Sequence, residues 1–462
     1  MKYQYLGYRL NKHLEKISFF FQIRESFSEI WHNELITEGR QKIAAWSRDA
    51  IQRIKEGAPP LSPVLLYEEL VALFKDRVWR RSVIIFVCGC VVGGGCGLAA
   101  GLRAAAHTPT GPHARALLSQ PDHSVLLVED AVAPGAGPGE VLVRVQAFSV
   151  CPEDRGVLRG RGHALRALTA RNTSLTVGRG FAGVVLDVGV GVTALEMGDE
   201  VWGCMSEWAG GAATELLTVR STRVSRRPRA LAADSAASLP WAGAQALKAL
   251  QRLHYTQGGC KGKRVAVMGA ASGEGCALVQ LLAASGAHVT AAAAAHAAAA
   301  LRARGAAECV TSLGASWLQL EQTAARVGPW DAVVACGAAG APPARHHNTQ
   351  ALLKATAPRD AIVDLRPRPL ITDRLPTPFA LVFAASLYTF RICRWVFGCG
   401  WHTDWLEEPE RLTEGLRALA QLVDEGQLTP LLDKVYLPQE FESALAHACS
   451  DDAIGTTVIR FP

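Results

Sequence analysis

The stretch "RVAVMGAASGEGCALVQLLAASGAHVTAA", residues 264–292, decides how the second half of this chain folds. It starts with a short apolar run, passes through a glycine-marked turn, continues as an apolar segment of helical length and ends in a second short run. Such a succession is typical of a strand, a tight turn, a helix and a second strand. The stretch therefore predicts the first unit of a parallel, doubly wound sheet.

Further short apolar runs follow at intervals that leave room for helices between them. The predicted strands are 264–269, 287–292, 308–312, 331–335 and 360–365. Strands that alternate with helices predict an α/β fold of the Rossmann type. Upstream, "PGAGPGEVLVRVQAFSVCPED" (134–154) and "VGRGFAGVVLDVGVGVTALEMGDEVWGC" (177–204) combine glycine and proline turns with alternating apolar residues. They predict a β-rich block that ends near residue 240.

The turn between residues 269 and 275 has the spacing of a dinucleotide-binding turn. Gly269 stands where the chain must bend, and Gly275 where the helix must pack closely on the strand. Ser272 adds a side chain where the backbone would approach a diphosphate, although its hydroxyl can itself donate to a phosphate. Glu274 stabilises a helix start by about 0.3–1 kcal/mol but would repel a diphosphate bound there. The predicted cofactor contacts of this turn are Gly269, Ala271, Ser272, Gly273, Glu274 and Gly275.

The end of the second predicted strand bears on the choice of cofactor. A site that prefers NAD has an acidic residue there to bind the ribose hydroxyls. This chain has "AAAAAHAAAALRAR" at 291–304, without any acid, which favours NADPH. Arg302 and Arg304 are the nearby cations, and we expect them on a solvated helix face.

Composition limits the other classes of function. The chain has 462 residues, a mild net charge of +6 and no cluster of basic residues of the kind that nucleic-acid-binding segments carry. Its 12 cysteines include no C-x-x-C pair, which argues against a structural zinc lobe and a disulfide framework. We expect reduced thiols in a large globular protein, with no nucleic-acid partner.

Residues 1–81 are expected to form a charged helical leader, broken by "GAPPLSP" at 57–63. Two interpretations stay open: an amphipathic helical pair that packs on the protein, or an arm that binds a partner. The first 25 residues are compatible with a mitochondrial targeting helix, since they carry five basic residues and two acids.

"SVIIFVCGCVVGGGCGLAAGL", residues 82–102, carries no charge and is long enough to span a bilayer as a helix. Its six glycines would cost a water-exposed helix about 5–6 kcal/mol relative to alanine. Glycine is better tolerated in membrane helices, and the fourfold repeat of glycine makes a flat ridge for another helix. The stretch predicts a transmembrane helix, with a buried core helix as the alternative, followed by a linker over 103–114.

The motifs "VGRGFAGVVLDVGVGV", "MGDEVWG", "SLPWAGAQALKAL" and "GKRVAVMGAASGEG" occur in this order along the chain. The chain resembles the quinone-reductase branch of the medium-chain dehydrogenase/reductase superfamily over about residues 115–462. The resemblance implies a GroES-like domain (115–243), a Rossmann domain (244–395) and a C-terminal segment (396–462) that completes the first. It also implies NADPH in the cleft, hydride transfer to a quinone or enone, a homodimer, a mitochondrial location and a membrane partner of the reticulon type.

The resemblance also identifies departures from the family pattern. Cys151 corresponds to the first zinc ligand of zinc-dependent members, but Arg179 and Gly180 stand where the His-Glu pair would be. One soft ligand does not hold zinc, so no metal is expected. Further cofactor positions carried over from the family are Ala294, Ser312 and Cys336. Because most of them lack the family's polar groups, two functions stay open: a reductase with no assigned catalytic residue, or a degenerate reductase that acts as a membrane-tethered scaffold.

Overall fold

The computed structural model describes most of the chain from residue 112 to the C-terminus, with gaps. The described ranges are 112–163 (without 121–122 and 134), 176–255, 259–311, 317–337, 352–367 (without 359) and 405–462, with isolated positions elsewhere. Within these ranges, none of the helices is both long enough and apolar enough to cross a bilayer. The predicted leader, span and linker over 1–114 lie almost wholly outside them, so the transmembrane helix at 82–102 stays a prediction.

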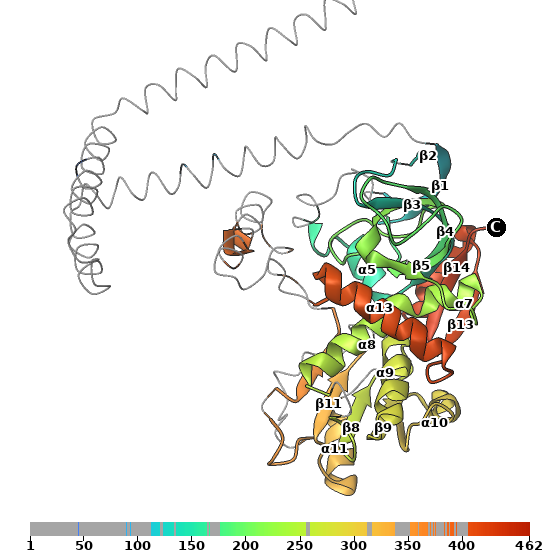
Figure 1. The fold of residues 1–462 in the computed structure, drawn as a ribbon. Coiled ribbons are helices and arrows are strands. Elements are labelled where there is room, and N and C mark those ends of the chain that lie inside the picture. Colours follow the sequence, from blue (N-terminus) through green and yellow to red (C-terminus); the bar gives the residue numbers. More distant parts are fainter. Residues whose placement is uncertain are drawn as a thin grey trace, which may run out of the picture. The chain divides into compact units, whose positions relative to one another are not determined.

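The described part of the Rossmann half contains a five-stranded parallel sheet with strand order β10-β9-β8-β11-β12. The strands are β8 (Arg264–Met268), β9 (His288–Ala293), β10 (Glu308–Thr311), β11 (Ala332–Ala335) and β12 (Ile362–Asp364). This sheet is drawn in yellow and orange in the lower part of Figure 1. All five strands overlap the segments expected from the sequence, which confirms the parallel α/β prediction.

Helices connect consecutive strands of this sheet. They are α9 (Gly273–Ala284), α10 (Ala298–Arg302) and α11 (Trp317–Val327), with a short 3₁₀ segment at Ala295–Ala297. Buried residues on nearly every turn of α9, among them Leu278 and Leu282, place this helix against the sheet as part of the largest core cluster. The β8–α9–β9 unit therefore fixes the turn at 269–275 at the carboxyl edge of the sheet.

The second sheet is the β-rich block expected from the sequence. Its strand order is β13-β14-β3-β4-β5-β7, and β6 pairs with β3. The bounds are β3 (Glu140–Val150), β4 (Gly180–Val188), β5 (Glu200–Cys204), β6 (Leu216–Arg220), β7 (Val224–Arg226), β13 (Leu432–Tyr436) and β14 (Thr456–Arg460). β14 of the C-terminal segment thus pairs with β3, which precedes the Rossmann sheet in the sequence. The domain limits 115–243, 244–395 and 396–462 stay predictions.

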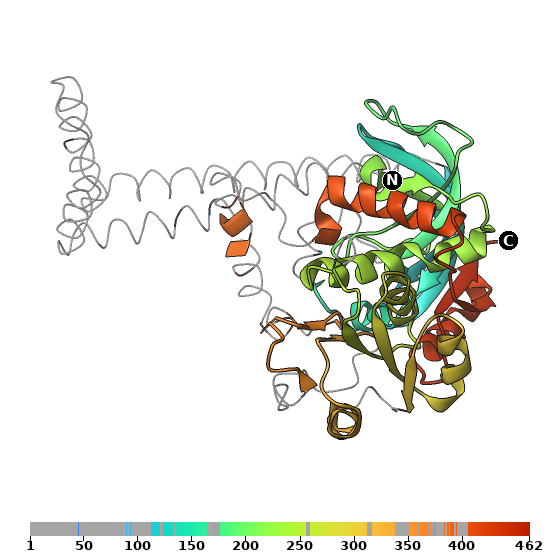
Figure 2. The ribbon, with the colours of Figure 1, turned by 60° about the horizontal axis from the view of Figure 1, so that its bottom comes forward.

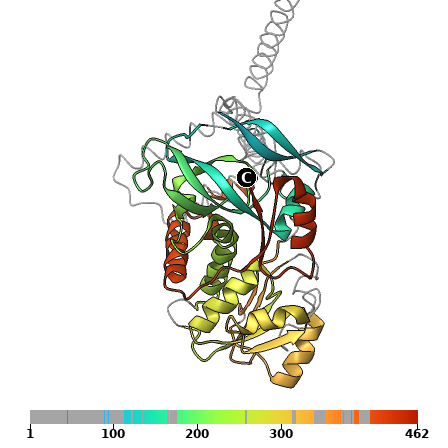
Figure 3. The same ribbon diagram turned by 90° about the vertical axis from the view of Figure 1, so that its right-hand side faces the viewer.

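A two-stranded ribbon of β1 (His113–Ser119) and β2 (Val125–Val132) lies at the outer end of this sheet, away from the Rossmann strands, as Figure 3 shows. The helices around the second sheet are α5 (Pro152–Leu158), α7 (Ala233–Ser238), α8 (Pro240–Arg252), α13 (Pro409–Asp424) and α14 (Phe441–Ala448). Short 3₁₀ segments lie at Ser221–Arg223, Trp405–Glu407 and Pro438–Glu440.

The two sheets meet along α8, which contacts α9 on the Rossmann side and β4 and β5 on the other. α13 lies beside α8, as the orange-red and green helices of Figure 2 show. A small apolar cluster at this junction joins Cys151 and Cys204 of the β-rich half to Trp241 of α8 and Leu416 of α13. The junction is packed by side chains from both halves, and the turn at 269–275 lies next to it.

Candidate functional site

The turn after β8 bends sharply at Gly269. Its φ of +63° is a left-handed conformation that a residue with a side chain rarely adopts. A Cβ at this position would also collide with the carbonyl oxygen of Cys336. The Ala270 N–H donates to the Ala292 carbonyl over 3.1 Å, which ties the bend to the end of the neighbouring strand β9. The sequence-based role of Gly269 as the bend is therefore confirmed.

Gly275 lets the first turn of α9 pack directly on this bend. A Cβ there would lie 2.6 Å from the Gly269 carbonyl oxygen and 2.7 Å from Cα of Ala270. Gly273 is equally restricted, because its Cβ would collide with the hydroxyl of Thr456 on β14. Both glycines are required by close packing, whereas a contact with a cofactor stays a prediction.

The start of α9 satisfies part of its own hydrogen-bonding capacity. Ser272 is the N-cap residue, and its hydroxyl oxygen accepts a hydrogen bond from the Gly275 N–H over 3.1 Å. The Glu274 carboxyl accepts one from its own backbone N–H. Two of the N–H groups that a diphosphate would use at a helix start are thus engaged by neighbouring side chains.

The other predicted cofactor positions lie at the carboxyl ends of adjacent strands. Ala294 follows β9 and is 8% exposed, and Cys336 follows β11 and is 1% exposed. The Ala271 carbonyl accepts a hydrogen bond from the Gly455 N–H over 2.7 Å, which joins the turn to the C-terminal segment. Ser312 lies outside the described residues. The structure therefore brings the described positions to one edge of the sheet.

Glu274 points from α9 toward the β-rich half of the molecule. Cys151 Sγ and one carboxylate oxygen each of Glu153 and Glu274 all lie within 4.8 Å of one another, and the three side chains are buried. We call these three residues the seam cluster, since Cys151 and Glu153 come from the start of α5 and Glu274 from the start of α9. Glu153 was not expected at a site from the sequence.

Burial dominates the protonation behaviour of the seam cluster. It raises the pKa of Glu153 to about 8, helped by the charges of Glu274 and Asp154. Burial also raises the pKa of Glu274, although hydrogen bonds from its own N–H and from Ser272 act in the opposite direction. The pKa of the Cys151 thiol is raised well above its usual range, again mainly by burial. Without a counter-charge, the cluster favours its protonated forms.

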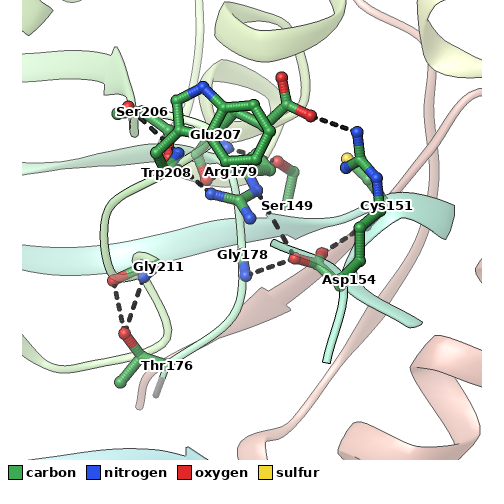
Figure 4. A network of polar contacts seen from close by, with 12 residues as sticks. Ser149, Cys151, Asp154, Thr176, Gly178, Arg179, Ser206, Glu207, Trp208 and Gly211 are labelled. Carbon is green, nitrogen blue, oxygen red and sulfur yellow. Dashed lines mark hydrogen bonds and ion pairs between the residues drawn. The ribbon is translucent and has the colours of Figure 1, made fainter. Parts of the chain in front are cut away.

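Asp154 and Arg179 form a buried ion pair beside the cluster. Oδ2 of Asp154 accepts from the Cys151 N–H over 2.9 Å and Oδ1 from the Gly178 N–H over 3.0 Å. Nε of Arg179 lies 3.9 Å from Oδ1, and its Nη1 donates to the Ser206 carbonyl over 2.6 Å. Figure 4 shows the carboxylate between these main-chain groups and the guanidinium. Burial raises the pKa of Asp154, while Arg179 and the two N–H groups oppose this shift.

Neither of the two positions that correspond to the His-Glu pair of zinc-dependent members can supply a zinc ligand. Arg179 is 1% exposed and held by Asp154, and its Cζ lies 6.0 Å from the centre of the Trp241 ring. At Gly180, any side chain would meet the Ala237 carbonyl oxygen at 2.7 Å and Ser149 Oγ at 2.8 Å. A ligand at residue 180 is therefore sterically excluded in this fold.

Sequence reasoning selected Glu274 but missed its partner Glu153. The available signal was local: "CPED" places two acids in the first turn of a short helix, next to a cysteine already singled out. The pairing itself depends on how the two halves pack, which no local pattern reports.

Part of this chain matches a known domain family, and its fold matches solved structures. Residues 137–229 match the alcohol dehydrogenase GroES-like domain. Among solved structures, the quinone oxidoreductase from Coxiella burnetii aligns with a TM-score of 0.57 and 23% identity over 75% of this chain and 99% of its own. The human synaptic vesicle membrane protein VAT-1 homolog-like protein aligns with a TM-score of 0.55 and 17% identity, over 76% and 99%. The chain thus contains a GroES-like domain, and its fold is that of these two solved structures.

Particular relatives are found at the level of sequence. The mouse mitochondrial NAD(P)H oxidoreductase RTN4IP1 is 34% identical over 188 residues, 38% of this chain and 45% of that protein. The human protein of the same name is 36% identical over 164 residues, 33% and 41%. The match to these two proteins thus spans less than half of their length. A chloroplast envelope quinone oxidoreductase homolog from Arabidopsis thaliana is 25% identical over 323 residues, 70% and 89%.

Proposed function

We propose that this protein is a nicotinamide-dependent oxidoreductase that transfers a hydride to a quinone or another conjugated carbonyl compound. The observation that carries the proposal is the bend at Gly269 with Gly275 packed against it, which sets the start of α9 close to the carboxyl edge of the sheet, as dinucleotide-binding turns require. The names of the mouse, human and Arabidopsis relatives support the same class of reaction.

The residues present fit a dinucleotide diphosphate if one side chain moves. The bend between Gly269 and Gly275 would hold the diphosphate, and the Glu274 carboxyl would have to leave its own N–H to make room. The cofactor supplies the hydride, and this chain supplies its position between the two halves. No acid–base dyad is required, because the reduced acceptor can take its proton from water.

We propose NADPH rather than NADH as the reductant. The support is Ala294 at the end of β9, where a carboxylate would otherwise bind the ribose hydroxyls. The absence of that acid removes the group that would repel a 2′-phosphate.

We also propose that the reaction uses no zinc of the type found in zinc-dependent relatives. Arg179 is committed to Asp154, and the packing around Gly180 excludes a ligand side chain there. Cys151 is the one residue of that ligand set that the described part of this chain retains.

Oxidation of NADPH by the purified full chain, with a soluble quinone as acceptor and a chelator present, tests the proposal. We expect turnover that is faster with NADPH than with NADH and that persists in the presence of the chelator. Absence of turnover with a panel of quinones and enones, at cofactor levels that saturate binding, would reject the reductase.

A degenerate reductase that acts as a scaffold is the second candidate, and one observation favours it. Ser272 and Glu274 already engage two N–H groups at the start of α9. This candidate requires that the native chain binds no dinucleotide.

Proposals for the location, the membrane anchor and the partners of this protein rest on its sequence and on the names of its relatives. We propose a mitochondrial protein, since the mouse, human and cattle relatives are named mitochondrial. We propose an anchor over 82–102, a homodimer, and a reticulon-like partner, the last suggested by the name of the Caenorhabditis elegans relative. Extraction of membranes with alkaline carbonate tests the anchor: the chain should stay with the lipid, and release of the full chain would contradict it.

A further inference from the structure

The seam cluster combines a thiol sulfur and two carboxylates from opposite sides of the junction. Cys151 and Glu153 belong to the start of α5, Glu274 belongs to the start of α9, and the three donor atoms lie within 4.8 Å of one another. A tetrahedral zinc ion holds sulfur and oxygen ligands about 3.6 Å apart, given metal–ligand distances of about 2.0–2.3 Å. Small side-chain rotations would therefore bring all three donors onto one ion.

The carboxylate of Glu153 has a buried oxygen atom without a hydrogen-bond donor among the described residues, which indicates that the seam cluster lacks a positively charged ligand. Glu153 as a residue is partly exposed, yet its carboxylate lies inside the cluster and is buried. Its Oε2 accepts no hydrogen bond from any described group. A buried acceptor without a donor is costly, and a bound cation removes that cost.

The charges around the seam cluster also favour a bound cation. The charged groups with the strongest effect on Glu153 are two carboxylates, Glu274 and Asp154, and the guanidinium of Arg179. Arg179 is already engaged by Asp154 and by the Ser206 carbonyl. Among the described residues, the two glutamates thus face each other at the junction, and the guanidinium that acts most on Glu153 is already paired with Asp154. Buried like charges at this range need neutralisation.

We propose that Cys151, Glu153 and Glu274 bind one divalent transition-metal ion of the zinc type between the two halves of the molecule. A thiolate selects a borderline ion such as Zn²⁺ over Mg²⁺ or Ca²⁺, and carboxylates are acceptable to it. Three protein ligands leave a fourth position for water or another ligand. Only Cys151 is shared with the zinc set of zinc-dependent relatives, and Glu274 comes from the other side of the junction.

The ion would link the two halves, because α5 and α9 contribute ligands from opposite sides. Binding would also turn Glu274 away from its own N–H toward the metal. The proposal goes beyond the reductase proposal and routes no step of hydride transfer through the ion.

Cobalt titration of the metal-depleted full chain, without any nicotinamide cofactor, tests this proposal. We expect one Co²⁺ per chain at the site, a thiolate-to-cobalt charge-transfer band and the intense visible bands of a four-coordinate ion, with Zn²⁺ displacing the cobalt. The Cys151→Ser variant should lose the charge-transfer band. The Glu153→Gln and Glu274→Gln variants should each weaken Co²⁺ binding by about tenfold or more.

Cys309→Ser is the matched control, since this half-buried cysteine on β10 belongs to no such cluster among the residues that the structure describes. It should bind Co²⁺ like the native chain, and circular dichroism should show every variant folded. A native chain without the charge-transfer band overturns the proposal, and so does a band that survives Cys151→Ser. In that case the two carboxyls share a proton instead. Because cofactor is absent, neither result bears on the reductase proposal.

Discussion

Gly275 and Glu274 are neighbours at the start of α9, but they constrain the site in opposite ways. Gly275 keeps the helix close to the bend, because a Cβ there would enter the space of the Gly269 carbonyl oxygen. Glu274 engages with its own carboxyl one of the N–H groups that a diphosphate would use there. The affinity for a dinucleotide depends on which of these two effects dominates.

Substitution Gly275→Ala should destabilise the protein by about 1–3 kcal/mol, the usual cost of overpacking a tight contact. The added methyl would lie 2.6 Å from the Gly269 carbonyl oxygen and 2.7 Å from Cα of Ala270, both of them backbone atoms. Chemical denaturation measures the change. Gly135→Ala is the control, since its Cβ would meet no atom within 4 Å and should leave stability unchanged. Equal stability of the two variants would show that the bend is looser than described.

Substitution Glu274→Val should raise the affinity for NADPH by about tenfold or more in the metal-depleted protein. The change removes a carboxyl that competes with the diphosphate for the N–H groups of α9, and a lost charge-assisted contact is equivalent to about 1.5–3 kcal/mol. Fluorescence titration with NADPH measures it. Glu414→Val, on the exposed side of α13, is the control. Unchanged affinity in Glu274→Val would mean that the carboxyl does not obstruct the diphosphate.

At the scale of elements, Asp331 joins the starts of β8 and β11. Its Oδ2 accepts from the Arg264 N–H over 2.8 Å and from Lys354 Nζ over 2.7 Å. Burial raises the pKa of Asp331, but the hydrogen bonds from Lys354 and Arg264 outweigh it and hold the pKa below the usual value of 3.8. The folded state thus binds this proton less readily than the unfolded chain.

This pKa shift predicts a loss of stability in acid. The stabilisation by Asp331 is fully present above the unfolded-state pKa near 3.8 and is lost as the pH falls through the lower folded-state pKa. Asp331→Asn should therefore lower stability at neutral pH by about 1.5–3 kcal/mol and flatten the acid limb of the stability curve. Chemical denaturation at pH values from about 6 down to about 2, a range that includes the ordinary carboxyl pKa values, measures both the stability and its fall in acid. An acid limb as steep as in the native chain would contradict the assignment.

The elements were predictable to different degrees. The Rossmann strands could be predicted because β8, β9 and β11 are short buried runs set off by glycine turns and helical segments. The turn glycines could also be predicted, because backbone geometry admits few other residues there. The seam cluster could not, because Glu153 and Glu274 are far apart in sequence and meet only when α5 and α9 are packed together.

At the scale of the whole molecule, the C-terminal segment joins the two halves. β14 pairs with β3 in the GroES-like sheet, and the Gly455 N–H just before it donates to Ala271 in the dinucleotide turn. A ligand at the turn therefore contacts the region where both sheets meet. The two sheets match the fold of the aligned solved structures, and Glu274 of the turn meets Cys151 and Glu153 at this junction.

Isothermal titration of NADPH into the full chain, with NADH as the comparison, tests the central claim that the bend at 269–275 receives a dinucleotide. The account predicts saturable binding of one NADPH per chain, and weaker binding of NADH because Ala294 offers the ribose no carboxylate. No saturable binding of NADPH at millimolar concentration would contradict it and would leave the fold without the cofactor of its relatives.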